Sequence, residues 1–197
     1  MLTQKFTLRY AAVLIISVHF LTLTACDKQQ ANDSTEQAVS DNATKPEAPS
    51  QNIHEATFFG NVQTVSKHIK AGTDLNQKDQ YGSTPLTIAA TFGKTEVAKA
   101  LIEGGANVDA PSSDGSTPLH VAAFFCRTEI VAMLLEKGAN KNVTNNFGST
   151  ALQSVEVPFD QVKPIYDQMS KDLGPLGLKL DYEYLGTTRP EIASMLK

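Results

Sequence analysis

The feature that most constrains this chain is an internal repeat with a step of 33 residues. The segment GSTPL begins at residue 82 and again at residue 115, and the related GSTAL begins at residue 148. The same step relates TEVAKALIEGGANVD, over 95–109, to TEIVAMLLEKGANKN, over 128–142. Such a repeat predicts a stack of small units, in which each unit buries its apolar face against its neighbours.

Each unit has the pattern of two short helices. Thr84 and Thr117 are expected N-caps, because a proline follows each of them at the first helical position, where no backbone N–H is needed. The second helix has apolar residues at 3–4 spacing, and a glycine follows where a left-handed C-cap is expected, at Gly105 and Gly138. Moving back one step aligns Gly60 with Gly93. The expected units therefore cover about 50–78, 79–111, 112–144 and 145–197.

The step of 33, together with TPLHVAA at 117–123, resembles the ankyrin repeat over roughly residues 50–157. The resemblance implies an all-α ankyrin solenoid of about four helix-pair repeats with short β-hairpin-like fingers. It also implies that His120 hydrogen-bonds the Thr-Pro loop of its own or a neighbouring unit. Thr87 replaces this histidine one unit earlier. Cys126 replaces a glycine, so either its backbone is strained or its helix continues.

The fourth unit contains additional residues. Five residues separate Ala123 from Glu129 in the third unit, whereas 34 separate Glu156 from Glu191 in the fourth. The last nine residues, RPEIASMLK, match RTEIVAMLL of 127–135 at five positions. We therefore expect an insertion at about 158–186, with a helix followed by a turn and an alternating extended stretch. The alternative makes 160–173 the second helix of the unit. The insertion would either cap the stack or bind a partner.

The first residues are typical of an export signal. Lys5 and Arg9 precede an apolar run that is too short to span a membrane comfortably. The run ends in LTAC at 23–26, which resembles the bacterial lipobox and implies cleavage before Cys26 and lipidation of its sulfur. Residues 1–25 are then a signal peptide and 26–51 a disordered polar linker before the repeat domain, 52–197. The resemblance implies a lipid-anchored chain facing the periplasm, with Asp27 favouring the inner membrane.

Charge and composition exclude several other functions. The net charge is −4, and it would be −6 without the two basic residues of the leader, which disfavours nucleic acid as a partner. No metal-ligand cluster, phosphate loop or cofactor motif is present in the sequence. Asp114, Ser116, His120 and Cys126 lie close together, but the repeat accounts for His120 without catalysis. We expect no enzyme activity; a redox-active Cys126 is the alternative, against a small buried cysteine.

Aromatic residues are the candidates for partner binding. Phe59, Phe92 and Phe125 recur at steps of 33, where they either border the groove or pack between repeats. Tyr81 and Phe147 belong to the expected finger tips, and we expect them and Phe124 to be exposed. The candidate partner-binding residues are Tyr81, Phe92, Asp114, Phe124, Phe125 and Phe147. The resemblance implies an unidentified protein partner, and we expect the chain to be a monomer. In one role the chain would scaffold envelope enzymes, and in the other it would be an immunity protein against a secreted effector.

Overall fold

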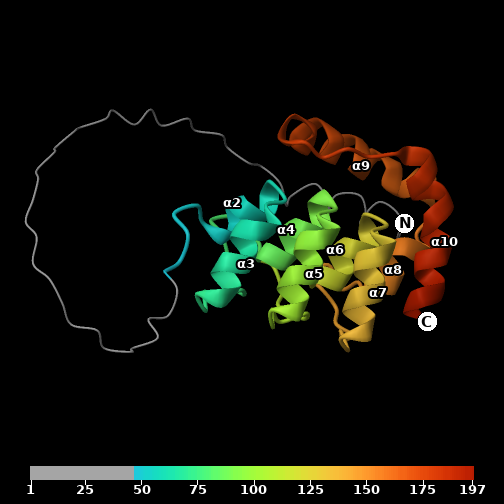
Figure 1. Ribbon diagram of the computed structural model, residues 1–197. Coiled ribbons are helices and arrows are strands. Elements are labelled where there is room, and N and C mark those ends of the chain that lie inside the picture. Colours follow the sequence, from blue (N-terminus) through green and yellow to red (C-terminus); the bar gives the residue numbers. More distant parts are fainter. Residues whose placement is uncertain (1–46) are drawn as a thin grey trace, which may run out of the picture.

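The computed structural model describes residues 47–197, which are helical throughout their regular parts (Figure 1). Inner and outer helices alternate along the chain. The inner helices are α2 (Ile53–Phe58), α4 (Pro85–Phe92), α6 (Pro118–Phe124) and α8 (Ala151–Glu156). The outer helices are α3 (Val62–Lys70), α5 (Thr95–Glu103) and α7 (Thr128–Glu136). Inner helices pack on inner helices and outer on outer, which confirms the stacked all-α architecture.

The local signals for helix ends are confirmed. Thr84 caps α4 by accepting a hydrogen bond from the Thr87 backbone N–H, and Pro85 stands at the first helical position. Gly105 and Gly138 both have positive φ, as the expected left-handed caps require. Cys126 also has positive φ, 52°, and α6 ends before it at Phe124. The first alternative for Cys126 is therefore correct: the helix does not continue, and the backbone takes the conformation that suits glycine.

The fingers are hydrogen-bonded turns between successive units, and no strand occurs in residues 47–197. In each finger a backbone N–H bonds a carbonyl four residues later, as from Asp79 to Ser83 at 2.9 Å. Adjacent fingers are also joined, since the Ser113 N–H donates to the Gly82 carbonyl at 3.1 Å. The fingers therefore form a continuous ledge along one edge of the stack.

The same substitution at Gly82 and at Gly148 can show how much the contact between adjacent fingers contributes to stability. Both have nearly equal positive φ, 76° and 75°, but a methyl group on Gly82 would lie 1.5 Å from Ser113 Oγ, whereas one on Gly148 would meet nothing within 4 Å. We expect Gly148→Ala to lower the unfolding free energy by about 1 kcal/mol, and Gly82→Ala by about 2 kcal/mol because Ser113 must also move. Urea unfolding measures both. Equal losses would show that the finger contact adds nothing.

The C-terminal part adds α9 (Phe159–Leu173), the 3₁₀ turn η2 (Gly174–Leu176) and α10 (Tyr182–Leu196). Figure 1 shows α9 extending back over the inner helices, while α10 stands at the end of the stack. Helix α10 packs on α8 and α7, and it buries Ile192, Ala193 and Leu196. These positions correspond to Ile130, Val131 and Leu134 of α7, which are also buried. The packing supports our proposed division, in which α10 completes the fourth unit and about 158–186 is inserted.

One part of the insertion differs from the expectation. The alternating stretch was expected to be extended through residues 182–186, but α10 begins at Tyr182. Asp181 explains the early start, because its carboxylate accepts the Tyr184 backbone N–H at 3.0 Å and caps the helix. The expectation was wrong because an apolar alternation of this length does not distinguish a short strand from the first turns of a capped helix.

Candidate functional site

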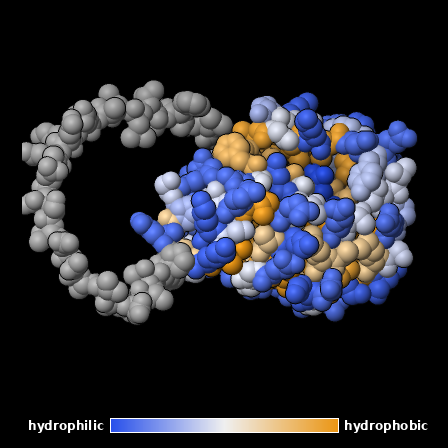
Figure 2. All heavy atoms as spheres, in the orientation of Figure 1, coloured by the Kyte–Doolittle hydropathy of each residue, from blue (hydrophilic) through white to orange (hydrophobic). Residues whose placement is uncertain are grey.

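The main hollow of the described residues is a groove between the inner helices and α9, which we call the concave groove. Its volume is about 930 Å³. Three elements border it: the inner faces of α2, α4 and α6; the fingers; and the C-terminal part of α9 with η2. Figure 2 shows apolar surface gathered where the ends of α2 and α9 approach each other. The groove is therefore walled on two sides, whereas stacked helix pairs alone would leave it open.

Aromatic rings line the groove in two groups. Phe58 and Phe92 meet edge to face with 4.8 Å between ring centroids. Phe124 contacts Tyr166 of α9 at 4.6 Å and Phe125 at 5.3 Å. Edge-to-face and tilted pairs of this kind are favourable beyond the area that they bury. The first group is partly exposed to the groove, whereas the second joins α9 to the stack.

Most of the predicted partner-binding residues do line the groove. Tyr81 is exposed, while Phe92, Asp114, Phe124 and Phe147 are half-buried. Three placements differ from the expectation. Phe147 is half-buried rather than exposed. Phe124 is partly covered, because Tyr166 lies against it. Phe125 is 4% exposed, so it packs in the core and offers a partner almost no surface.

The ladder of phenylalanines at steps of 33 does not form as a continuous contact. Phe59 is 64% exposed and does not line the groove, and it is the preceding Phe58 that meets Phe92. Phe58 is the last residue of α2, and Phe59 is the C-cap residue that follows it. Met169, Leu173 and Leu176 are groove residues that the sequence did not indicate, because nothing local showed that α9 would lie opposite α2.

A buried hydrogen-bond network holds α9 over the groove. The Tyr166 hydroxyl donates to the Phe124 carbonyl and accepts from Arg189 Nη1 at 3.0 Å. Arg189 Nη2 donates to the carbonyls of Ser154 and Val157, both at 2.8 Å. Both side chains are buried, and burial raises the pKa of Tyr166, so its hydroxyl keeps its proton. The network therefore connects α6, α8, α9 and α10.

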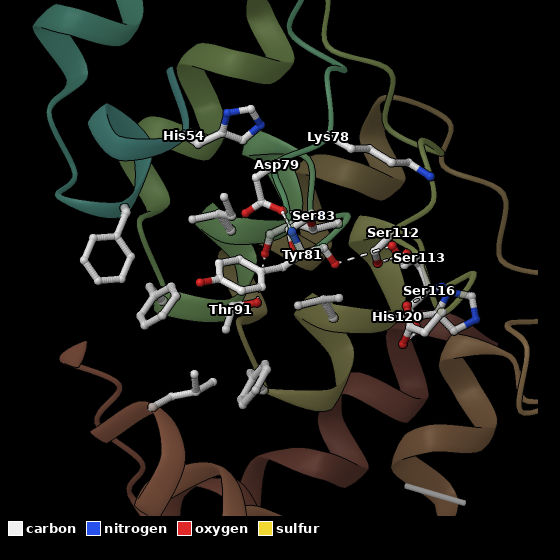
Figure 3. A pocket seen from close by; sticks show the side chains of 18 of the residues that line it. His54, Lys78, Asp79, Tyr81, Ser83, Thr91, Ser112, Ser113, Ser116 and His120 are labelled. Atoms are coloured by element: carbon white, nitrogen blue, oxygen red, sulfur yellow. Dashed lines mark hydrogen bonds between the residues drawn. The ribbon is translucent and has the colours of Figure 1, made fainter. Parts of the chain in front are cut away.

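Polar residues occupy the finger side of the groove (Figure 3). Asp79 Oδ1 accepts the backbone N–H groups of Tyr81 and Ser83. Asp114 accepts from the Ser116 N–H and hydroxyl. Glu55 is exposed on α2 at the open end. These three carboxylates outnumber one lysine, Lys78, so the lining of the groove is acidic.

His120 has the structural role that the resemblance implies. Its Nδ1 accepts the Thr117 backbone N–H at 3.2 Å, and its Nε2 donates to the Ser149 carbonyl of the next unit at 3.0 Å. Burial lowers the pKa of His120, which favours the neutral ring that these two bonds require. At the equivalent position one unit earlier, the Thr87 hydroxyl donates to the Thr84 carbonyl. Both nitrogens of His120 are thus engaged, Nδ1 within its own unit and Nε2 with the next unit.

The redox alternative for Cys126 does not fit its surroundings. The side chain is 1% exposed, and its sulfur lies 3.8 Å from the Leu185 carbonyl of α10. Burial raises the pKa of the Cys126 thiol to about 11. A reactive cysteine needs an accessible thiolate, and Cys126 provides neither access nor charge at neutral pH.

We expect the Cys126 thiol to react slowly with a thiol-specific disulfide reagent at pH 8. Its raised pKa leaves on the order of 100-fold less thiolate than an unperturbed cysteine would have, and burial slows the reaction further. The measurement uses the Cys26→Ser chain, in which Cys126 is the remaining cysteine, in buffer and in denaturing urea. A native rate within tenfold of the rate in urea would contradict the assignment.

The described residues contain no cluster of ligands that could hold a metal ion. No helix within 47–197 is both long enough and apolar enough to span a membrane. The fold and the groove thus define a class: a stack of helix pairs with a concave binding surface. Residues 53–145 match the sequence profile of the ankyrin repeats in three copies. A search of curated proteins found no significant match.

The stacked helix pairs of the described residues agree with this match to ankyrin repeats over 53–145. Such repeats are typically non-catalytic modules for protein–protein interaction, which directs attention to the concave groove as the binding surface. The segment that resembles a lipobox, including Cys26, lies outside the described residues. The expected linker, 26–51, lies almost wholly outside them.

Proposed function

We propose that this chain binds one protein partner through its concave groove and finger tips, without catalysis. The observation that supports this most is the groove, where Phe58, Phe92 and the exposed Tyr81 surround a hollow of about 930 Å³. Aromatic side chains that surround a concavity are the usual anchors of protein–protein interfaces. The buried hydrogen bonds of His120 and Arg189 keep the walls in place before a partner arrives, which lowers the cost of ordering them.

Photo-crosslinking tests the surface directly. A photoreactive amino acid at Tyr81 or Phe147, both on finger tips, should capture the same protein in the cell. The same amino acid at Glu129, which is exposed on the outer helix α7, should not capture it. Capture of that protein with equal yield at all three positions, or at Glu129 alone, would reject the groove as the binding surface.

We also propose that the partner is bound at the bacterial envelope, through a lipid on the Cys26 sulfur. The support is the order of basic residues, apolar run and LTAC at 23–26. Asp27 favours the inner membrane with the chain facing the periplasm. Growth with a clickable palmitate analogue should label the chain, and Cys26→Ser should abolish the label. Undiminished labelling of the Cys26→Ser chain would exclude this anchor.

A further inference from the structure

We propose that the occupant of the concave groove is a single amphipathic helix of the partner, which carries lysine or arginine side chains toward the fingers. This inference rests on the proposed function and deepens it, because it specifies what the partner presents. Three properties of the groove lead to it: its two walls, the state of the backbone that lines it, and its charge.

A groove with two walls accommodates a narrow, elongated segment of the partner rather than a broad, flat surface. Met169, Leu173 and Leu176 of α9 and η2 border the groove on the side opposite the fingers. An α-helix is about 10–12 Å wide and rises 1.5 Å per residue. The groove also passes three inner helices, which at 8–10 Å between axes is a length of about 16–20 Å. A helix of about 11–13 residues matches this length.

The backbone of the walls selects a helix rather than an extended peptide. An extended peptide binds by adding to an open strand edge, where its N–H and C=O groups find partners. Residues 47–197 contain no strand, and the groove is bordered by helices and by fingers whose backbone groups already bond to one another. An extended segment would therefore bury unpaired polar groups in an aromatic slot, which is costly. A helix pairs its own backbone and exposes only side chains.

The charge of the groove indicates which kinds of residue the partner helix carries. Glu55, Asp79 and Asp114 follow the finger side from α2 to the second finger, and the ion pairs of the described residues all lie elsewhere, on α9 and at Lys197. The opposite side is apolar. A helix with apolar residues on one face and basic residues on the other complements both sides. A second copy of this acidic chain would bring like charges together.

Two 14-residue probe peptides test the proposal: LKKLLKLLKKLLKL and its acidic counterpart LEELLELLEELLEL, each with a fluorescent label. They are titrated with the chain as the cell produces it, purified in one non-ionic detergent that is present in every sample. We expect the basic peptide to bind at least tenfold more tightly than the acidic one. Equal binding of the two would overturn the proposal, because it would indicate adsorption to apolar surface alone.

Two pairs of variants locate the binding. Leu176→Ser changes an exposed groove residue, and Tyr184→Ser changes an exposed apolar residue outside the groove. Glu55→Gln with Asp79→Asn removes two groove charges, while Glu103→Gln with Glu129→Gln removes two charges from outer helices. Asn145 already accepts the same two backbone bonds in the third finger, so an asparagine at position 79 preserves the turn.

Both groove variants should weaken binding of the basic peptide at least tenfold, and both controls should leave it within twofold. Equal effects of groove and control variants would overturn the helix proposal. The proposed function fails by a separate result, namely that photoreactive groups on the finger tips capture nothing that Glu129 does not. Specific capture at the finger tips without peptide selectivity would reject the basic helix and leave the groove as the binding surface.

Discussion

Replacing Arg189 by methionine is expected to lower the unfolding free energy by about 3–4 kcal/mol and to release α9 from the groove. Arg189 is buried, and it donates to the Ser154 and Val157 carbonyls and to the Tyr166 hydroxyl. Methionine has nearly the same length but donates nothing, so two partly buried carbonyls and the Tyr166 hydroxyl each lose the bond from Arg189. Hydrogen bonds from a charged donor to buried acceptors are among the stronger ones.

Urea unfolding measures the loss, and hydrogen exchange in α9 and α10 locates it. Tyr166→Phe is the matched variant, because it keeps the ring contacts with Phe124 and removes only the hydroxyl between Arg189 and the Phe124 carbonyl. We expect it to cost about 1–2 kcal/mol. Arg189→Lys should lower the unfolding free energy nearly as much as Arg189→Met, because one ammonium group cannot reproduce the planar guanidinium that reaches three acceptors. A loss below 1 kcal/mol for Arg189→Met, with unchanged exchange in α9, would refute the role of this network.

This network explains how the groove acquires its second wall. Tyr166 contributes its ring to Phe124 and its hydroxyl to the Phe124 carbonyl and Arg189, so α9 is held near its middle. Its C-terminal end then lies beside Leu176 at the open end, opposite Phe58. If Arg189→Met frees α9, the groove loses its apolar wall while the fingers remain. Binding of the basic peptide should then weaken in parallel with exchange in α9.

The repeat could be predicted because its signals are local and recur. Threonine before a helix start and glycine after a helix end act within a few residues, and the step of 33 places each of them three times. Even the departure at Cys126 followed this logic, since the position requires positive φ whichever residue occupies it. The candidate groove residues followed from the same periodicity, and Tyr81, Phe92 and Phe147 do line the groove.

The second wall could not be predicted because long-range contacts place it. The spacing of Val162, Tyr166 and Leu173 indicates a helix with an apolar face, but not the surface that this face covers. The sequence also gives no indication of the contacts of Arg189, which aligns with Arg127 of the third unit. Arg127 donates to the Thr91 carbonyl of the preceding unit, whereas Arg189 is enclosed by the end of the stack. The same residue type at aligned positions thus serves different contacts, depending on what is packed around it.

Replacing Leu119 by alanine is expected to cost about 3–4 kcal/mol, whereas the same change at Leu152 should cost about 1–2 kcal/mol. The two leucines are one step of 33 apart, each at the second position of an inner helix after its threonine cap. Leu119 is fully buried in α6, which packs against α4, α7 and α8. Leu152 is half-buried in α8, near the end of the stack. Urea unfolding of both variants compares their free energies.

The same pair tests whether α9 and α10 close the stack. Without closure, a terminal unit unfolds before the rest, since stability in a repeat array is shared only between neighbours. Because Arg189 connects α8 with α9 and α10, we expect Leu152→Ala to unfold in one transition by circular dichroism and by Tyr fluorescence. An early, separate transition for Leu152→Ala would show that the C-terminal helices do not close the stack. The groove would then depend on the first three helix-pair units alone, and α9 would contribute no stable wall for a partner helix.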